Sequence, residues 1–144
     1  MSTPHPALGI DHGEVRMGLA ATDAEGILAH PLETIDRRRT DPLNRIGEIC
    51  RQRGIRTLVV GLPVRLDGSE GSNAASVRAF AKKLRAGLPG LPLVLIDETF
   101  TTSTAAEKLR EAGIKAKNQR PVIDQAAAVE ILNGWMESIE PCDP

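Results

Sequence analysis

The sequence predicts an α/β fold: a mixed five-stranded sheet, made of an antiparallel meander plus two parallel strands, with helices on both faces. Three strand-like runs follow one another before the first helical stretch, which indicates the meander. Short apolar runs then alternate with stretches of helical periodicity, which is typical of parallel strands joined by right-handed crossovers. The length of 144 residues suits one domain of ordinary size.

The meander and the helix after it have clear boundary signals. Asp41 and Pro42 supply an N-cap and a proline at the first helical position, and Gly54 is expected to end this helix. Its apolar residues recur at helical spacing, so one of its faces should be buried. The three strands before it are expected at residues 8–11, 16–22 and 27–35.

The second half of the chain should add two strands and three helices. The all-apolar run 57–61 predicts an interior strand parallel to the first, and 93–96 predicts another buried strand. The polar and basic stretch from Gly113 to Arg120 is expected to be a mobile loop. The helices are expected at about 72–85, from Thr104 to near Gly113, and at about 124–136.

Composition limits the classes of function. Aromatic residues make up 2% of the chain, so stacking of bases on exposed aromatic rings is not a main binding mode, and the net charge of −1 gives no global attraction to nucleic acid. Cys50 and Cys142 match neither a metal site nor a disulfide framework. No signal peptide or membrane span is recognised, so we expect a cytoplasmic protein without membrane contact. We expect residues 1–144 to form one domain with its core at about 7–136 and short flexible termini.

Three carboxylates occupy comparable places in the predicted fold. Asp11 follows the first strand and Glu98 the last, and parallel strands would bring both to the same edge of the sheet. Asp124 precedes Ala127 and Ala128 by three and four residues, which places it on the buried stripe of the last helix. Two simpler interpretations stay open: Asp11 as a turn former and Asp124 as a helix cap.

These acids favour one kind of chemistry. Carboxylate oxygens without neighbouring His or Cys ligands suit Mg²⁺ or Mn²⁺ rather than zinc. A pair of such cations clamps the attacking and leaving oxygens of a phosphodiester. The pattern therefore predicts metal-assisted phosphodiester hydrolysis.

Four motifs together resemble the YqgF family, bacterial RNase H-like proteins described as Holliday junction resolvases or pre-16S ribosomal RNA nucleases. The match runs in order from about Ala7 to Trp135. Three positions depart from the family pattern: Thr99-Phe100 replaces Arg-Leu, His12 replaces Tyr, and Glu14 adds an acid. The motifs are Gly9-Ile10-Asp11-His12-Gly13 with Arg16-Met17-Gly18-Leu19-Ala20, Val60-Gly61-Leu62-Pro63 with Asp67-Gly68, Asp97-Glu98 with Thr101-Thr102, and Asp124-Gln125-Ala126-Ala127-Ala128 with Ile131-Leu132.

The resemblance implies an RNase H-like fold and a metal-dependent endonuclease. It implies that Asp11, Glu98 and Asp124 are the catalytic and metal-binding acids. It also implies that structured nucleic acid is cleaved, with 5′-end processing of pre-16S ribosomal RNA as the cellular role and a four-way DNA junction as the alternative substrate. Ribosome-assembly or transcription proteins are candidate partners, and the chain is expected to be a monomer or a weak homodimer.

The expected nucleic-acid-binding residues are basic. Arg16 follows Asp11 closely and either contacts the scissile strand or pairs with an acid. Lys115, Lys117 and Arg120 precede Asp124 and either neutralise a phosphate backbone or lie in solvent. Outside this set, His12 is interpreted as a surface histidine, Thr101 and Thr102 as helix-preceding residues, and Arg37-Arg38-Arg39 as a solvated turn.

Two other classes of function compete with the nuclease hypothesis. Sugar kinases and actin-like ATPases share the opening strand-Asp-Gly pattern, but they need two such domains around a nucleotide, and 144 residues provide one. A non-catalytic partner of the transcription or translation machinery would keep the fold without needing the acids. The intact acid set favours the nuclease.

Overall fold

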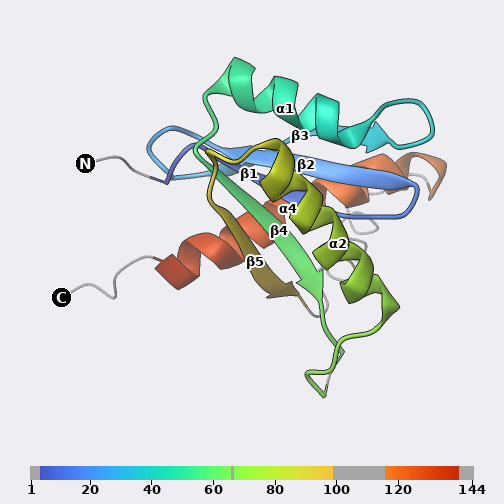
Figure 1. Ribbon diagram of the computed structural model, residues 1–144. Helices are drawn as coiled ribbons and strands as arrows, with labels where there is room; N and C mark the ends of the chain where they lie inside the picture. The colour runs from blue at the N-terminus through green and yellow to red at the C-terminus, as the bar shows by residue number, and fades with distance from the viewer. Residues whose placement is uncertain (1–3, 66, 99–115, 140–144) are drawn as a thin grey trace.

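The computed structural model describes residues 4–65, 67–98 and 116–139 (Figure 1). Its strands form one sheet in the order β3-β2-β1-β4-β5, in which β3, β2 and β1 are antiparallel neighbours and β1, β4 and β5 are parallel neighbours. This confirms the predicted mixed sheet. The elements are β1 (Ala7–Asp11), β2 (Arg16–Thr22), β3 (Ala29–Asp36), α1 (Pro42–Arg53), β4 (Thr57–Pro63), α2 (Ser72–Gly87), β5 (Leu93–Glu98) and α4 (Ala116–Ile139).

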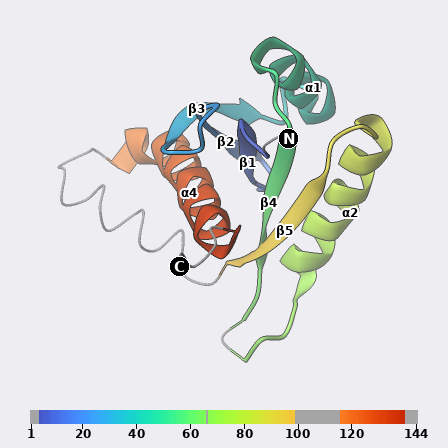
Figure 2. The same ribbon diagram turned by 90° about the vertical axis from the view of Figure 1, so that its left-hand side faces the viewer.

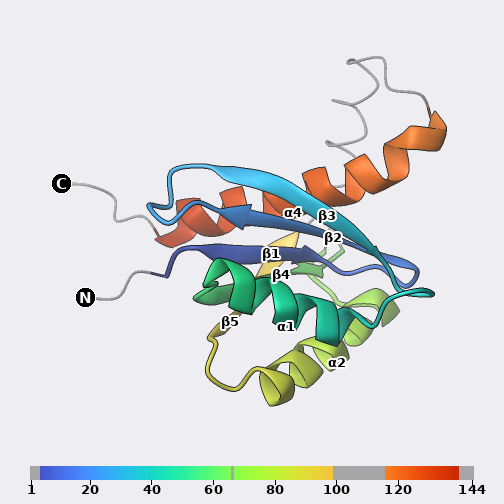
Figure 3. The same cartoon turned by 90° about the horizontal axis from the view of Figure 1, so that it is seen from above.

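The sheet separates two helical layers, with α4 on one face and α1 and α2 on the other (Figures 2 and 3). Because side chains alternate along a strand, Leu8 and Ile10 pack into the core beneath α1 and α2, whereas Ala7 packs into the core beneath α4. Leu, Ile, Val and Ala build most of both cores, as the scarcity of aromatic residues requires.

The turn between β2 and β3 shortens the third strand relative to its prediction. The Asp23 carboxylate accepts hydrogen bonds from the backbone N–H groups of Ile27 (2.8 Å) and Leu28 (3.3 Å), so these groups are not available to a strand ladder. Strand β3 therefore begins at Ala29 rather than at Ile27. The side chains of Ile27 and Leu28 are exposed.

Helix α1 begins and ends where the sequence predicts. Pro42 is its first residue, and Gly54 ends it in the left-handed conformation with φ 65°, which glycine adopts without a Cβ penalty. Asp41 is at the N-cap position, although its side chain makes no capping hydrogen bond. Strand β5 differs from its prediction: it is the edge strand and is half-buried rather than buried, because only β4 flanks it.

The prediction that the last helix begins near Asp124 is wrong. Helix α4 begins at Ala116, so the loop predicted for Gly113 to Arg120 is helical over 116–120. The residues at 116–120 are Ala, Lys, Asn, Gln and Arg, which lack an apolar stripe but are compatible with a helix. Extending a helix that is already packed costs little free energy, because the unfavourable nucleation step has been made. None of the helices in the described ranges has the length and hydrophobicity needed to span a bilayer.

Candidate functional site

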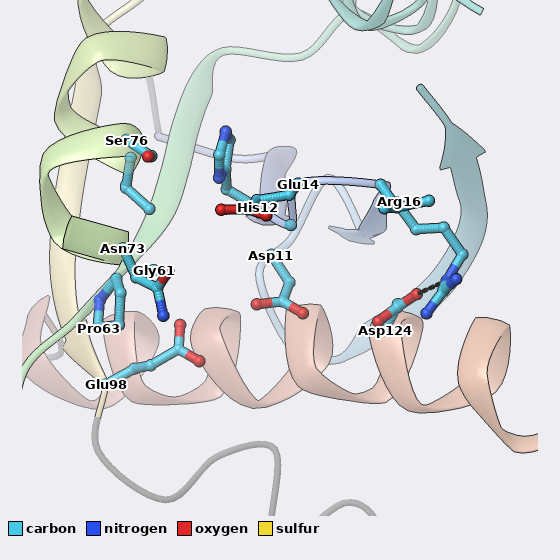
Figure 4. A pocket seen from close by; sticks show the side chains of 13 residues that line it. Asp11, His12, Glu14, Arg16, Gly61, Pro63, Asn73, Ser76, Glu98 and Asp124 are labelled. Carbon is cyan, nitrogen blue, oxygen red and sulfur yellow. Dashed lines mark hydrogen bonds and ion pairs between the residues drawn. The ribbon is translucent and has the colours of Figure 1, made fainter. Parts of the chain in front are cut away.

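A cavity of about 440 Å³ opens at the carboxyl ends of β1, β4 and β5 (Figure 4). Side chains from the sheet, from the first turns of α2 and from α4 contribute to its wall. All three predicted carboxylates are in this wall, so the fold brings together residues that are far apart in the sequence. The lining residues are Asp11, His12, Gly13, Glu14, Val15, Arg16, Gly61, Pro63, Asn73, Ser76, Val77, Glu98 and Asp124.

Asp11 is the last residue of β1 and lies between Glu98 and Asp124 (Figure 4). Burial, together with the negative charges of Glu98 and Asp124, raises the pKa of Asp11 to about 8. The interpretation of Asp11 as a mere turn former does not account for these surroundings. The carboxylate is held where its charge is unfavourable unless a cation or a proton is present.

Glu98 is the last residue of β5, and the glycine beside it on β4 makes room for it. A Cβ at Gly61 would overlap the Glu98 carboxylate and would come within 2.5 Å of Ile131. Burial raises the pKa of Glu98 to about 7. Glu98 is therefore a second carboxylate whose ionisation the protein opposes.

Asp124 projects from the interior of α4, well after the helix start at Ala116, and is therefore not an N-cap. Its Oδ2 accepts a hydrogen bond from Nε of Arg16 at 3.0 Å, and the Asp124 side chain is 19% exposed. The backbone of α4 at Asp124 lies directly on β2, where a Cβ at Gly18 would overlap the Asp124 carbonyl oxygen. Arg16 thus pairs with an acid, and this acid is part of the pocket itself.

The donor set of the pocket suits a hard divalent cation. Three carboxylates offer oxygen ligands, and the raised pKa values of Asp11 and Glu98 indicate negative charge that a cation would compensate. Among the described residues, no three His, Cys, Asp or Glu side chains already close around a single metal position. Asp124 is turned toward Arg16 instead (Figure 4).

Several residues of the pocket were not among the predicted site residues. Asn73 and Ser76 lie one helical turn apart at the start of α2 and add an amide and a hydroxyl to the wall. Their position at the start of the helix that follows β4 was the available sequence signal. Glu14 also lines the pocket.

His12 is not the surface histidine that the sequence suggested. Its ring is half-buried and lies 5.1 Å from the ring of Phe80, measured between centroids. Burial, followed by the positive charge of Arg37, lowers the pKa of His12, so its surroundings favour the uncharged ring.

The solvated turn predicted for Arg37-Arg38-Arg39 is wrong at its first residue. Arg38 and Arg39 are exposed and pair with Asp36 at 3.1 and 3.9 Å. Arg37 instead turns inward, and its Nη1 donates to the carbonyl oxygen of Gly13 at 2.7 Å. The difference arises because the chain reverses at Asp36 and directs only the first of the three side chains toward the sheet edge.

The other predicted basic residues are described only in part. Lys117 and Arg120 are in the first turns of α4, and Lys115 lies outside the described residues, as do Thr101, Thr102 and the Thr99-Phe100 departure. The helix predicted from Thr104 to near Gly113 also lies outside them. The nucleic-acid-binding role of these basic residues stays a prediction.

Comparison with solved structures identifies the fold. The chain is similar to "T. thermophilus RuvC in complex with Holliday junction substrate", with a TM-score of 0.59, 19% identity, and coverage of 92% of this chain and 94% of that one. A second structure, "Thermus thermophilus RuvC structure", matches with a TM-score of 0.53 and 17% identity over the same shares of the two chains. The predicted RNase H-like fold is confirmed.

Comparison with sequences identifies the family. Proteins named "Putative pre-16S rRNA nuclease" match in Nocardia farcinica, with 47% identity over 90% of this chain and 76% of the relative, and in Mycobacteroides abscessus, with 43% identity over 94% and 82%. The model of the RuvX family, described as "Holliday junction resolvase", matches residues 5–138. These matches confirm the resemblance drawn from the four motifs, and the chain belongs to the RuvX family of nucleases.

Proposed function

We propose that this protein is a divalent-metal-dependent endonuclease that cleaves structured nucleic acid, and that its substrate is precursor 16S ribosomal RNA. The observation that carries the proposal is the convergence of Asp11, Glu98 and Asp124 on one cavity at the carboxyl end of the sheet. The relatives named as pre-16S rRNA nucleases support the choice of substrate.

The three carboxylates would hold the cation, Mg²⁺ or Mn²⁺. A divalent cation at such a site supplies activation of the attacking water and charge stabilisation at the leaving oxygen. Asp11 lies between the other two acids and would be the central ligand of the set (Figure 4). Arg16 neutralises Asp124 as long as the two are paired at 3.0 Å.

Other groups in the wall suit the phosphate. The Asn73 amide and the Ser76 hydroxyl can donate hydrogen bonds to non-bridging oxygens, and both come from the first turns of α2. The Arg16 guanidinium has further N–H donors beyond the one that Asp124 accepts, so it can contact a phosphate from the opposite side of Asp11. Hydrogen-bond donors on both sides of Asp11 would therefore orient a phosphodiester.

A four-way DNA junction is the second candidate substrate. The description of the family model and the junction-bound RuvC structure of similar fold favour it. Both substrates expose a preformed backbone shape, which suits a chain with 2% aromatic residues. We further propose that the protein works in the cytoplasm, where bacterial ribosomal RNA matures, as a monomer or weak homodimer, alongside ribosome-assembly or transcription proteins.

The decisive experiment compares cleavage of labelled precursor ribosomal RNA with cleavage of a labelled four-way DNA junction, each with Mg²⁺, with Mn²⁺ and with EDTA. We expect cleavage of the RNA that needs the cation. Asp124→Asn should lower kcat by at least about 10²-fold and leave binding largely intact, because Asp124 acts in the transition state. The matched control is Asp97→Asn, which removes an exposed carboxylate adjacent to Glu98 and should keep full activity.

Two results would count against this assignment. Cleavage that survives Asp124→Asn unchanged would show that the carboxylates do not carry the reaction. Absence of cleavage of either nucleic acid with both cations would favour the non-catalytic alternative.

A further inference from the structure

A second cavity, of about 280 Å³, adjoins the carboxylate pocket. The two cavities share three wall residues, so a ligand that fills the first can continue into the second without leaving the protein surface. The second cavity lies between the end of β3 and the exposed side of α2. Its wall includes His12, Glu14, Arg37, Ser76, Phe80 and Lys83, of which His12, Glu14 and Ser76 also line the carboxylate pocket.

Arg37 is held firmly in this cavity. Its Nη1 donates to the Gly13 carbonyl oxygen at 2.7 Å and lies 3.3 Å from Nε2 of His12, and its guanidinium carbon lies 5.9 Å from the centroid of the Phe80 ring. Within the described part of the chain, these side-chain hydrogen bonds use Nη1 alone. The Nε and Nη2 edge of the planar group is therefore oriented but has no described protein acceptor, the arrangement from which arginine makes bidentate contacts to phosphate.

Lys83 adds a second cation on the same wall. It is exposed on α2, one helical turn after Ala79 and Phe80, and its ammonium is a mobile point charge that can follow a phosphate. Among the described residues of this wall Glu14 is the one acid, so two cations accompany one carboxylate here. The adjoining pocket has the opposite balance, with Arg16 against Asp11, Glu14, Glu98 and Asp124.

We propose that the Arg37–Lys83 cavity binds a backbone phosphate of the nucleic-acid strand, next to the phosphate that is cleaved. This inference rests on the proposed nuclease function and assigns a place to a second part of its substrate. Arg16 lies in the wall of the carboxylate pocket, and Arg37 and Lys83 lie in the wall of the adjoining cavity. A strand that passes from the pocket into the cavity therefore meets positive charge in both. The contact is to the backbone and carries no base preference.

The test uses two adjacent lysines of α2. Lys83→Ala removes the cavity lysine, whereas Lys82→Ala removes an exposed lysine that is not in the cavity wall. Binding of labelled structured RNA is measured in EDTA over a series of salt concentrations, and cleavage is measured with Mg²⁺. We expect Lys83→Ala to weaken binding about 3–10-fold, to reduce the salt slope by about 1, and to raise KM with kcat nearly unchanged. Lys82→Ala should match the wild type in all three measurements.

Arg37→Lys separates geometry from charge. It keeps the positive charge but cannot make a bidentate contact, so we expect weaker binding with an unchanged salt slope. If Lys83→Ala and Lys82→Ala behave alike while the wild type binds and cleaves RNA, the subsite is wrong and the nuclease assignment stands. If the wild type neither binds nor cleaves nucleic acid, the nuclease assignment fails and the subsite falls with it.

Discussion

Asp11 is surrounded by groups that oppose its ionisation. It is the final residue of a buried strand and faces Glu98 on one side and Asp124 on the other (Figure 4). The pKa of Asp11 is raised to about 8 because the ionised carboxylate is unfavourable in this pocket. A bound cation would remove that penalty, so cation binding and protein stability should be linked.

We expect millimolar Mg²⁺ or Mn²⁺ to raise the melting temperature of the wild type, because a ligand that binds only the folded state stabilises it. The stabilisation is about 2.7 kcal/mol when the free cation is at 100 times its Kd. Asp11→Asn should lose most of this shift, measured by thermal unfolding with the cation and with EDTA. Asp97→Asn serves as the control and should keep it. Equal shifts in the wild type and in Asp11→Asn would mean that the cation binds elsewhere.

At the scale of elements, glycines on three neighbouring strands decide how closely α4 approaches the sheet. A Cβ at Gly9 would lie 2.6 Å from the Leu132 side chain, and Cβ atoms at Gly18 and Gly61 would overlap Asp124 and Glu98. Small residues on β1, β2 and β4 therefore set the position of two of the three acids. The packing of α4 on the sheet and the arrangement of the carboxylates depend on the same close contact.

Gly18→Ala tests this contact. The added methyl group must displace the helix backbone at Asp124, so we expect a loss of about 1–3 kcal/mol in the free energy of unfolding and a marked loss of cleavage. The matched control is Gly134→Ala on α4, where the new methyl meets nothing within 4 Å and should stabilise the helix by about 0.5–1 kcal/mol. Urea unfolding measures both variants. A neutral Gly18→Ala would show that α4 can shift at no cost.

An ion pair ties β3 to α1. Arg45 donates from Nε and Nη2 to the two carboxylate oxygens of Glu33 at 2.8 and 2.7 Å, and these hydrogen bonds are the main reason why the pKa of Glu33 is lowered. A carboxylate with a lowered pKa contributes stability above its unfolded pKa, and this contribution is lost as the pH falls through the folded value. The pair should therefore stabilise the protein at neutral pH and not in acid.

Glu33→Gln should cost about 0.5–1 kcal/mol of unfolding free energy at pH 7, the upper range for a partly exposed pair with bidentate geometry. In acid, below the lowered pKa of Glu33, the difference from the wild type should largely vanish, because Glu33 is then protonated. Urea unfolding at both pH values measures this, with Glu137→Gln as an exposed control on α4. A difference that persists unchanged in acid would assign the effect to packing instead.

For the whole molecule, a formal charge of −1 means that attraction to nucleic acid must come from local cations. Arg16 is in the pocket wall, and Lys117 and Arg120 begin the helix that carries Asp124. Together with Lys115, these four cations predict a modest affinity that depends steeply on salt. About four phosphate contacts would reduce binding about 10²-fold between about 50 and 200 mM salt.

Replacing Lys115, Lys117 and Arg120 together with alanine should weaken RNA binding and flatten its dependence on salt, with little change in kcat. This outcome is the reverse of the one expected for Asp124→Asn. Filter binding across a salt series measures the slope, and single-turnover cleavage measures the chemical step. An unchanged slope would remove these residues from the nucleic-acid surface.

Sequence patterns alone determined most of the elements and the set of acids. Local signals did this: Pro42 and Gly54 bound α1, apolar runs mark β1 and β4, and carboxylates follow two parallel strands. The family motifs then indicated the nuclease class. That the full chain forms one domain with flexible ends stays a prediction.

Tertiary structure alone decided the details that depend on distant partners. Helix α4 extends back to Ala116 because packing of its later turns on the sheet supports polar residues that carry no periodic signal. Arg37 turns inward because its guanidinium donates a hydrogen bond to the Gly13 carbonyl and lies over the Phe80 ring. Arg16 pairs with Asp124, which is 108 residues away in the sequence. Sequence patterns report the conformational preferences of neighbouring residues. Pairings between distant residues arise only when the folded sheet brings separate segments within contact distance.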